Sequence, residues 1–349
     1  MNHSHLNLKT PIAAFAVAVL FILGQLTAIG ADAEQFNRRL GLGMNLGNAL
    51  EAPKEGAWGL TIKPEYFKTI KGAGFSHVRI PICWSAHAKA DAPYTIDPEF
   101  LLRVDEVVRE ALSNNLMVVI NMHRYGELEQ NPGKHKDRFL SMWDQIAQHF
   151  HNASPNLAFE IYNEPARGLT EEVWNKLLIQ ALQVIRTSNP DRCVVIGPAQ
   201  FNSLYSLVAL KLPENDTHLI VTIHYYQPFS FTHQGAPWVG PESAKWLGTT
   251  WGGDASDRAR LAASFDITKQ WREQNMKPIY VGEFGSFGKA DIKSRERWTN
   301  AVSEAAAARK FSAAYWEFGS GFGVYDIQTN SWREPLLKAL IDGWKSAHH

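Results

Sequence analysis

The chain has 349 residues, with 35 basic and 35 acidic side chains, so its formal net charge at pH 7 is zero. A balanced charge gives no electrostatic reason to bind nucleic acid or an anionic membrane surface, and it favours a neutral ligand. Only Cys83 and Cys193 are present, so the fold has no disulfide framework; we expect two buried thiols.

The first thirty-odd residues differ from the rest. A polar start carrying Lys9 leads into an apolar run, residues 11–30, which ends in small residues up to Ala33. This order is typical of a secretory signal peptide, so we predict a signal peptide at 1–33, cleavage after Ala33 and secretion of residues 34–349. The alternative is a membrane anchor, but three residues interrupt the run before the roughly 20 apolar residues that a span needs: Gln25, Thr27 and Gly30.

Short β-rich apolar runs alternate with helix-like segments through the rest of the chain. The runs are 41–48, 77–82, 117–123, 157–164, 193–199, 219–226, 278–285 and 313–318. A typical intervening segment, 171–188, has apolar residues at three- and four-residue spacing, which indicates a helix. The pattern predicts an α/β fold, a single-domain (β/α)₈ TIM barrel over residues 34–349. A doubly wound sheet is the alternative, but no G-x-G-x-x-G turn follows the first run.

Polar and aromatic residues gather at the C-terminal parts of these runs. They are Asn45, Asn48, Arg79, His123, Asn163, Glu164, His224, Tyr226, Glu283 and Trp316. In a barrel these strand ends form one face, and active sites are built on that face. We therefore expect these side chains to meet around one opening.

The longest connection, residues 227–256, follows the sixth run and is rich in aromatic residues. We interpret it as one wall of a binding cleft, with Trp238 as the preferred stacking residue. The alternative is a loop whose aromatic side chains pack on one another.

Two glutamates suit glycosidic bond hydrolysis. This reaction needs a proton for the leaving oxygen and a negative charge beside the reacting carbon, and two carboxyl groups meet both needs without a metal. Glu164 ends the fourth run and Glu283 the seventh, so their side chains could reach the roughly 5–5.5 Å separation of retaining enzymes. Either residue alone could be a structural glutamate, but two at matching strand ends favour a catalytic pair.

Arg79 and Tyr226 could hold Glu283 ionised, one by its charge and the other by a hydrogen bond. Alternatively, Arg79 only neutralises Glu160, which shares the inward parity of Tyr162 and Glu164 along its strand.

Four more residues have predicted supporting roles. Asn163 is placed to bind the hydroxyl next to the reacting carbon, and His224 could orient Glu164, whose pKa should be raised so that it begins as an acid. His123 should contact sugar hydroxyls or the carboxylates. Trp316 would form the floor beneath the sugar, although it could instead belong to the barrel core.

No metal or other cofactor is predicted. The chain has no H-E-x-x-H pair, no Cys/His cluster and no G-x-S-x-G elbow. The remaining metal interpretation is a site built from His123, His224 and a carboxylate.

Seven segments of the chain carry a resemblance to glycoside hydrolase family 5 of clan A, particularly its Thermotoga-type endoglucanase/mannanase subgroup. They are GMNLGNALEAP, GFSHVRIPICWS, VVINMHRYGEL, FEIYNEP, IVTIHYYQPFSFTHQGAPW, PIYVGEFG and AAYWEFGSGFGVYD. The resemblance implies a TIM barrel, endo-cleavage of β-1,4-glycans, net retention and no cofactor, with Glu164 as acid/base and Glu283 as nucleophile. It also implies supporting roles for Arg79, His123, Asn163, His224, Tyr226 and Trp316, and sugar contacts for Asn45, Glu51, Trp238 and Glu317.

One position departs from the subgroup. Members often have two adjacent histidines after the third strand, whereas here His123 is followed by Arg124. Because the second histidine is associated with mannose-type sugars, we expect higher activity on glucan than on mannan. The whole chain is expected to be a monomeric, retaining endo-β-1,4-glucanase that hydrolyses soluble β-glucan polysaccharides or oligosaccharides of the cellulose and mixed-linkage types, with glucomannan as a further candidate substrate. The alternatives are an endo-β-1,4-mannanase, a metallo-hydrolase and a barrel that binds carbohydrate without turnover.

Overall fold

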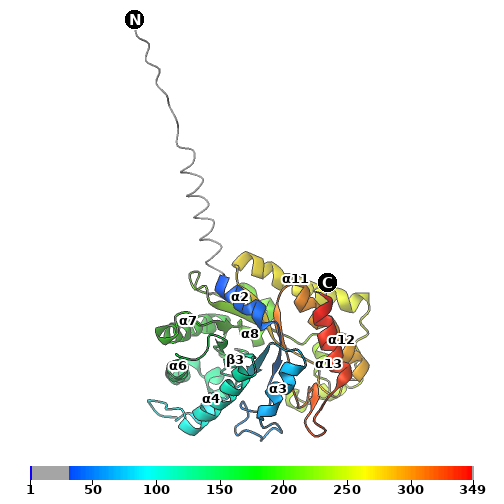
Figure 1. The fold of residues 1–349 in the computed structure, drawn as a ribbon, viewed down its shortest axis with the longest axis horizontal. Coiled ribbons are helices and arrows are strands. Elements are labelled where there is room, and N and C mark those ends of the chain that lie inside the picture. Colours follow the sequence, from blue (N-terminus) through cyan, green and yellow to red (C-terminus); the bar gives the residue numbers. More distant parts are fainter. Residues whose placement is uncertain (2–30, 348–349) are drawn as a thin grey trace.

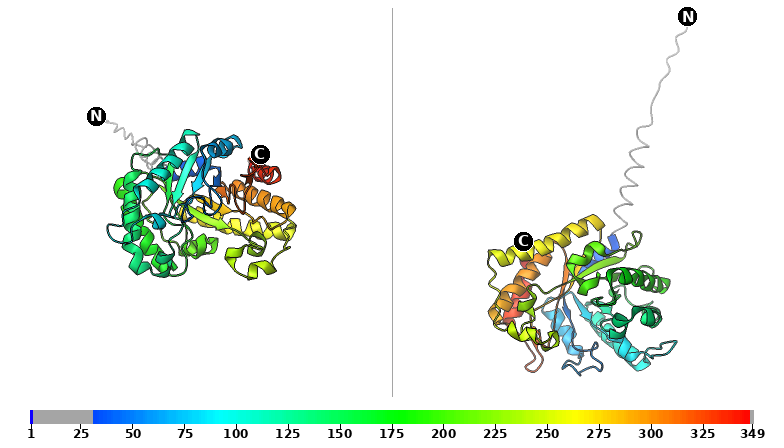
Figure 2. Two further views of the ribbon diagram at one scale, coloured as in Figure 1. Left: turned by 90° about the horizontal axis from the view of Figure 1, so that it is seen from below. Right: turned by 180° about the vertical axis from the view of Figure 1, so that it is seen from behind.

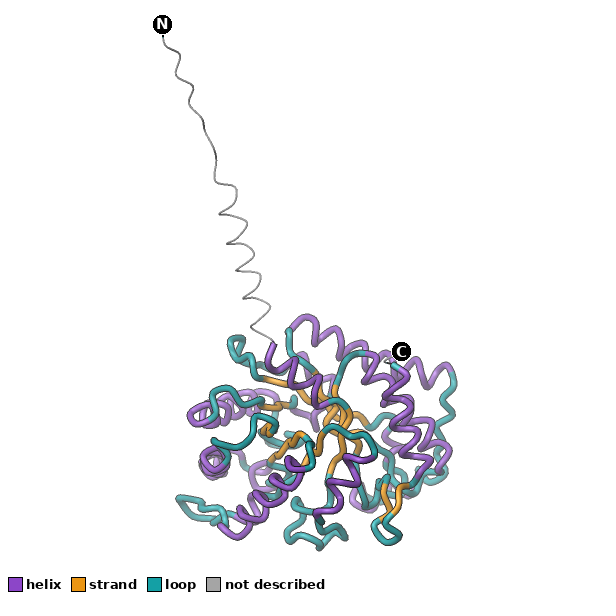
Figure 3. The backbone as a smooth tube through the Cα atoms, in the orientation of Figure 1, coloured by secondary structure: helices purple, strands orange, loops and turns teal. Residues whose placement is uncertain are grey.

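The computed structural model describes Met1 and residues 31–347. Eight parallel strands close into a barrel in chain order, each paired with its sequence neighbours and β8 with β1. The strands are β1 (Leu42–Asn45), β2 (His77–Ile80), β3 (Met117–Asn121), β4 (Leu157–Glu160), β5 (Val194–Ile196), β6 (Leu219–Tyr225), β7 (Ile279–Phe284) and β8 (Ser312–Tyr315). Figure 3 shows them gathered at the centre of the molecule with helices around them. The predicted (β/α)₈ barrel is confirmed.

Helices cover the outside of the barrel (Figures 1 and 2). The longer ones are α2 (Ala31–Leu40), α3 (Pro64–Gly72), α4 (Pro98–Ser113), α6 (Pro132–His149), α7 (Glu171–Ser188), α11 (Ala255–Asn275), α12 (Ile292–Ala308) and α13 (Glu334–Ser346). The short ones are η1 (Trp84–His87), α5 (Gly126–Gln130), α8 (Ala199–Asn202), η2 (Leu204–Ala209), α9 (Phe229–Thr232), η3 (Pro237–Val239) and α10 (Glu242–Lys245). A small hairpin, β9 (Tyr325–Asp326) and β10 (Ser331–Trp332), precedes α13.

Several helices begin where the sequence supplies a capping side chain. Thr170, Asp254 and Asp291 accept a hydrogen bond from the backbone N–H three residues later, at the starts of α7, α11 and α12. Each cap satisfies a donor that the first turn of a helix leaves open. The N-terminus of α7 therefore falls at Glu171, as the sequence predicts.

Strand alternation divides the core into two parts. Side chains pointing out of the barrel, such as Val118 and Ile120, pack in the large cluster beneath the helices. Inward-pointing side chains such as Val119 form a second cluster, which α2 covers with Ala33, Phe36 and Leu40. This largely apolar plug fills the N-terminal half of the barrel, and the polar side chains within it, His77 and Ser312, are hydrogen-bonded to α2.

A bulge in β7 redirects one side chain. The register between β6 and β7 shifts after Ile223 and Val281, so that Gly282 is an extra residue and Glu283 pairs with His224. Such bulges reverse the alternation locally, and here the bulge lets Glu283 face the barrel mouth. A Cβ atom at position 282 would lie 2.5 Å from a threonine hydroxyl, so only glycine fits.

Two features of the chain ends and cysteines bear on the sequence predictions. Cys83 and Cys193 are both buried thiols and no disulfide joins them, as expected. Most of the predicted signal peptide, residues 2–30, lies outside the described residues, and the predicted cleavage point at Ala33 falls within α2. Among the described residues, no helix has the length and apolar character to cross a membrane.

Candidate active site

A cleft of ≈ 390 Å³ opens at the C-terminal ends of the strands. It is lined by Asn48, Glu51, Trp58, His123, Arg124, Glu129, Asn163, Glu164, Phe201, Tyr226, His233, Trp238, Glu283, Trp316, Ser320, Gly321 and Phe322. Eight of the twelve predicted site residues are in this set. The other four, Asn45, Arg79, His224 and Glu317, do not line the cleft; Asn45, Arg79 and Glu317 are fully buried and His224 is 7% exposed.

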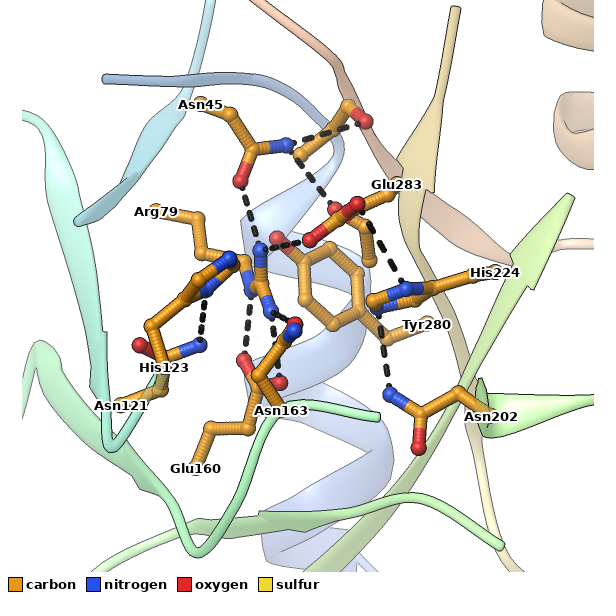
Figure 4. Close-up of polar contacts among 12 residues, drawn as sticks. Asn45, Arg79, Asn121, His123, Glu160, Asn163, Asn202, His224, Tyr280 and Glu283 are labelled. Carbon is orange, nitrogen blue, oxygen red and sulfur yellow. Dashed lines mark hydrogen bonds and ion pairs between the residues drawn. The ribbon is translucent and has the colours of Figure 1, made fainter. Parts of the chain in front are cut away.

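Arg79 is the centre of the buried network beneath the cleft (Figure 4). Its Nε and Nη2 donate to the two oxygens of Glu160 at 2.6 and 2.8 Å, and Nη1 donates to Glu283 Oε1 at 2.8 Å. The two remaining N–H groups donate to Asn45 Oδ1 at 2.9 Å and Asn163 Oδ1 at 2.7 Å. All five guanidinium donors are thus used, and both interpretations of Arg79 hold: it neutralises Glu160 and also holds Glu283.

The buried guanidinium makes a strong stability prediction. Arg79→Met should lower the free energy of unfolding by about 3–5 kcal/mol, because Glu160 is fully buried and would lose its charge partner. Chemical denaturation followed by far-UV circular dichroism measures the change.

The matched control is Arg109→Met, which removes an ion pair with Asp105 from a side chain that is 70% exposed. That change should cost less than about 1 kcal/mol. Equal losses for the two variants would contradict the structural role of Arg79.

Glu164 and Glu283 approach each other closely across the cleft. One carboxylate oxygen of each, together with a ring nitrogen of His224, lies within 4.8 Å of the other two. His224 Nδ1 is 2.7 Å from Glu164 Oε1 and 3.6 Å from Glu283 Oε2, and Tyr226 donates to Glu283 Oε2 at 2.8 Å. Carboxylate oxygens no more than 4.8 Å apart suit the roughly 5–5.5 Å separation of retaining glycosidases and not the roughly 6.5–9.5 Å arrangement that holds a water.

The two carboxyl groups have different surroundings. Burial raises the pKa of Glu164 to about 7, opposed by Arg79. Burial also raises the pKa of Glu283, but His224, Arg79 and the Tyr226 hydroxyl all oppose that rise. Because Glu283 receives direct hydrogen bonds from Arg79 and Tyr226, the anion is better stabilised there. A proton held by the pair therefore resides on Glu164.

His123 and Trp316 both line the cleft and stack on each other. Their rings stack with centroids 5.6 Å apart and planes at 8°. Asn121 donates from Nδ2 to His123 Nδ1 at 3.3 Å, while its Oδ1 accepts from the Ile82 N–H at 3.2 Å, which fixes the direction of the amide. Burial lowers the pKa of His123 well below its usual value, so the neutral ring carries its proton on Nε2.

Two predicted sugar-contacting residues lie below the cleft surface. Asn45 Nδ2 donates to the Gly282 carbonyl at 2.9 Å, and its Oδ1 accepts from Arg79, so its polar atoms are occupied inside the barrel. The Glu317 carboxylate accepts N–H groups from Gly319, Ser320 and Phe322 and is fully buried. Both side chains support the cleft rather than line it, which differs from the expectation that they contact sugar.

Glu51 occupies an intermediate position. Its carboxylate accepts N–H groups from Asn48 and Ala49, capping the turn after β1, yet it also lines the cleft. Burial raises the pKa of Glu51 to about 7.

The aromatic connection after β6 has both of the roles considered for it. Trp238, 61% exposed, and His233 line the cleft, whereas Phe231 and Trp251 are buried in the core. Trp238 also packs edge-on against Phe287 with ring centroids 4.9 Å apart.

Three aromatic residues that line the cleft were not predicted from the sequence. Trp58 lies in the connection between β1 and α3, Phe201 in the turn after β5, and Phe322 in the segment after β8. The Arg124 guanidinium stands 4.9 Å above the Trp58 ring, so these two side chains form one part of the wall. A search for aromatic residues after every strand end, instead of the sixth only, would have found all three.

The residues that could hold a metal are the same residues that the carboxylate chemistry needs. Within residues 31–347, only Glu164, His224 and Glu283 bring carboxylate or imidazole ligand atoms close enough to share a cation. A larger hollow of ≈ 860 Å³ beside α2 and α11, at the N-terminal end of the barrel, contains none of the predicted site residues.

A closed (β/α)₈ barrel with two adjacent carboxyl groups at the C-terminal mouth defines the class of barrel glycoside hydrolases. The family model for cellulase, glycosyl hydrolase family 5, matches residues 42–321. The chain belongs to this family.

Relatives of named function are similar over most of the chain. Endoglucanase H of Acetivibrio thermocellus is 39% identical over 317 residues, which are 89% of this chain and 34% of that protein. This chain therefore spans about a third of that relative's length. Crystal structures of Thermotoga maritima Cel5A with mannotriose and with cellobiose are each 50% identical, with a TM-score of 0.87 over 88% of this chain and 100% of theirs.

Proposed function

We propose that this chain is a retaining endo-β-1,4-glucanase acting on soluble β-glucans. The observation that carries the proposal is the pair Glu164 and Glu283, with carboxylate oxygens within 4.8 Å of each other in the cleft. Family membership and the endoglucanase relatives support it. The clustering of aromatic side chains around the pair supports a carbohydrate ligand, since flat apolar faces stack on sugar rings.

In the proposed mechanism, Glu283 attacks the anomeric carbon while Glu164 gives its proton to the departing glycosidic oxygen. Arg79 and Tyr226 keep Glu283 ionised and aimed. In the second step Glu164, now a carboxylate, removes a proton from water, which attacks the glycosyl–enzyme bond and restores the starting configuration.

Asn163 has the geometry for a contact near the reacting carbon. Its Oδ1 accepts from Arg79, so its NH₂ group is the end that can donate to the sugar hydroxyl next to the anomeric centre. A hydrogen bond there that strengthens as positive charge develops would favour the transition state.

We also infer that residues 34–349 form a single catalytic domain of a secreted, monomeric protein, after removal of a signal peptide at 1–33. The zero net charge supports a neutral polysaccharide over nucleic acid or a membrane surface. The intact mass of the protein from the culture medium tests the cleavage point, and light scattering tests the monomer.

The substrate preference should favour glucan over mannan by about tenfold or more, the size of effect that one altered contact in a binding site produces. The physical reason is Arg124, which covers Trp58 in the cleft wall where a shorter histidine is common in the subgroup. Initial rates on barley β-glucan, carboxymethylcellulose, glucomannan and pure mannan measure the preference, and NMR of the first products should show the β-anomer.

Arg124→His is the matched variant and should narrow the difference between glucan and mannan. Activity should be unchanged in a strong chelator, which separates the proposal from a metallo-hydrolase. Faster cleavage of mannan than of β-glucan would support the mannanase alternative, and an absence of reducing-sugar release would support a binding barrel without turnover.

A further inference from the structure

Asn202 lies beneath the cleft and contacts the histidine that contacts the acid. It ends the short turn after β5, is fully buried, and donates from Nδ2 to His224 Nε2 at 3.2 Å (Figure 4). It does not line the cleft and touches neither carboxyl group. Any influence on the reaction must therefore pass through His224, which holds Glu164 Oε1 at 2.7 Å.

The backbone around Asn202 has an unusual left-handed conformation. Gln200, Phe201 and Asn202 are consecutive residues with φ of 59°, 62° and 54°, in the left-handed region. Non-glycine residues there cost on the order of 1–3 kcal/mol each and persist only where surrounding contacts hold them. One such contact joins the Phe201 N–H to the Pro165 carbonyl at 3.2 Å, which ties this turn to the segment that carries Glu164.

Room for the Asn202 side chain depends on a glycine. A Cβ atom at position 197 would lie 2.0 Å from Asn202 Oδ1, so only Gly197 admits the amide. The Oδ1 atom itself has no hydrogen-bond partner, although it is buried. Burying an amide oxygen without a hydrogen bond costs folding free energy. Among the described residues, the hydrogen bond to His224 is the one polar contact that the Asn202 side chain makes.

The contact determines where His224 carries its proton. Burial lowers the pKa of His224 to about 4, so the ring is neutral near pH 7 and has one N–H donor and one lone-pair acceptor. The Asn202 NH₂ group faces Nε2 in the structure, and because an amide NH₂ group can only donate, Nε2 accepts. The ring proton is then on Nδ1 and is donated to Glu164 Oε1.

We propose that Asn202 is a positioning residue that fixes this tautomer of His224, so that the catalytic proton of Glu164 resides on Oε2. With Oε1 occupied as an acceptor, the acid's own proton sits on the other oxygen and is available to the leaving group. The reversed tautomer would present a lone pair at Nδ1, and Glu164 would then donate its proton to the histidine. The role assigned to Glu164 here rests on the proposed function.

The kinetic test uses Asn202→Asp, which keeps the shape and replaces the donor by an acceptor. Two aryl β-cellobiosides are compared: the phenyl glycoside, whose departure needs a proton, and the 2,4-dinitrophenyl glycoside, whose departure does not. We expect kcat/KM for the phenyl substrate to fall about tenfold or more and that for the dinitrophenyl substrate to change less than about twofold, since only acid catalysis is affected.

Two further variants distinguish a loss of positioning, which affects acid catalysis alone, from a general loss of active structure. Asn202→Gly removes the amide but accepts the left-handed backbone, and it should show a smaller loss of the same selective kind. Asn189→Asp places an aspartate at a position that is 3% exposed and outside the cleft, and the ratio of the two kcat/KM values should stay unchanged. Equal losses on both substrates in Asn202→Asp would overturn the proposal.

A direct readout of the tautomer does not depend on activity. In protein labelled with ¹⁵N-histidine, His224 should show a protonated Nδ1 and an unprotonated Nε2 near neutral pH, with its signals assigned from a His224→Gln variant among the 13 histidines. Asn202→Asp should move the proton to Nε2, where the new carboxylate accepts it. A protonated Nε2 in the parent protein would refute the assignment, whereas an inactive parent with the expected tautomer would refute only the proposed function.

Discussion

Glu283→Ala should abolish turnover of every natural substrate, with a rate loss on the order of 10⁵-fold or more, comparable to removing the nucleophile of other covalent enzymes. Arg79 and Tyr226 both hold this carboxylate at the reacting face, and the methyl group of alanine cannot replace it. Reducing-sugar release from barley β-glucan and steady-state turnover of the dinitrophenyl cellobioside measure the loss.

External azide should restore cleavage in Glu283→Ala, because the shortened side chain leaves room for a small anion at the anomeric carbon. A bond forms from azide to that carbon as the glycosidic bond breaks, the leaving oxygen takes the Glu164 proton, and the product is the inverted α-glycosyl azide. The control Glu283→Gln fills the same space with a neutral amide, so azide should not rescue it. Activity near the parental level in either variant would mean that Glu283 is not the nucleophile.

The barrel itself could be read from the sequence because its signals are local. All eight predicted runs contain the observed strands or overlap them, and the segment 171–188 is helix α7 at both ends. The predicted runs extended past the C-terminal ends of the observed strands, where the cleft lies. Run 157–164 reaches Glu164, for example, whereas β4 ends at Glu160, because the residues beyond form bends and Glu164 itself has a φ of 51°.

Strand parity failed at that same boundary. Parity placed Tyr162 on the inward face with Glu160, but Tyr162 packs outward against Phe139 and Trp174 of the surrounding helices, and its hydroxyl donates to Glu129. Alternation holds only while the backbone follows the ladder. The bulge at Gly282 is the opposite case, because it turns Glu283 inward where simple alternation would have turned it out.

The depth of each residue could not be predicted. A strand-end position says which end of the barrel a side chain occupies, but not whether neighbours cover it, as they cover Asn45 and Glu317. The turn that contains Phe201 and Asn202 could not be predicted from the sequence for a related reason. Three consecutive left-handed residues have no sequence signal when none is glycine, and they are stabilised by tertiary contacts.

Glu164→Ala should lower kcat/KM on polysaccharide by roughly 10²–10⁴-fold, the usual contribution of a general acid. The first step on the dinitrophenyl cellobioside should survive, because that leaving group departs without a proton. The second step also loses its base, so the glycosyl–enzyme should accumulate, and azide should accelerate its breakdown to the β-glycosyl azide with retained configuration.

The pH profile gives an independent check on Glu164. Burial disfavours its anion and raises its pKa to about 7, and the protonated form is the active acid. Parental kcat/KM on phenyl cellobioside should therefore be high below about pH 7 and fall as pH rises through that value. In Glu164→Ala the fall should be absent from the residual rate on the phenyl substrate, whereas Glu127→Gln, which removes an exposed carboxyl on α5, should keep both the parental rate and the fall. If the alkaline fall persists in Glu164→Ala, another group supplies the proton and the acid must be reassigned.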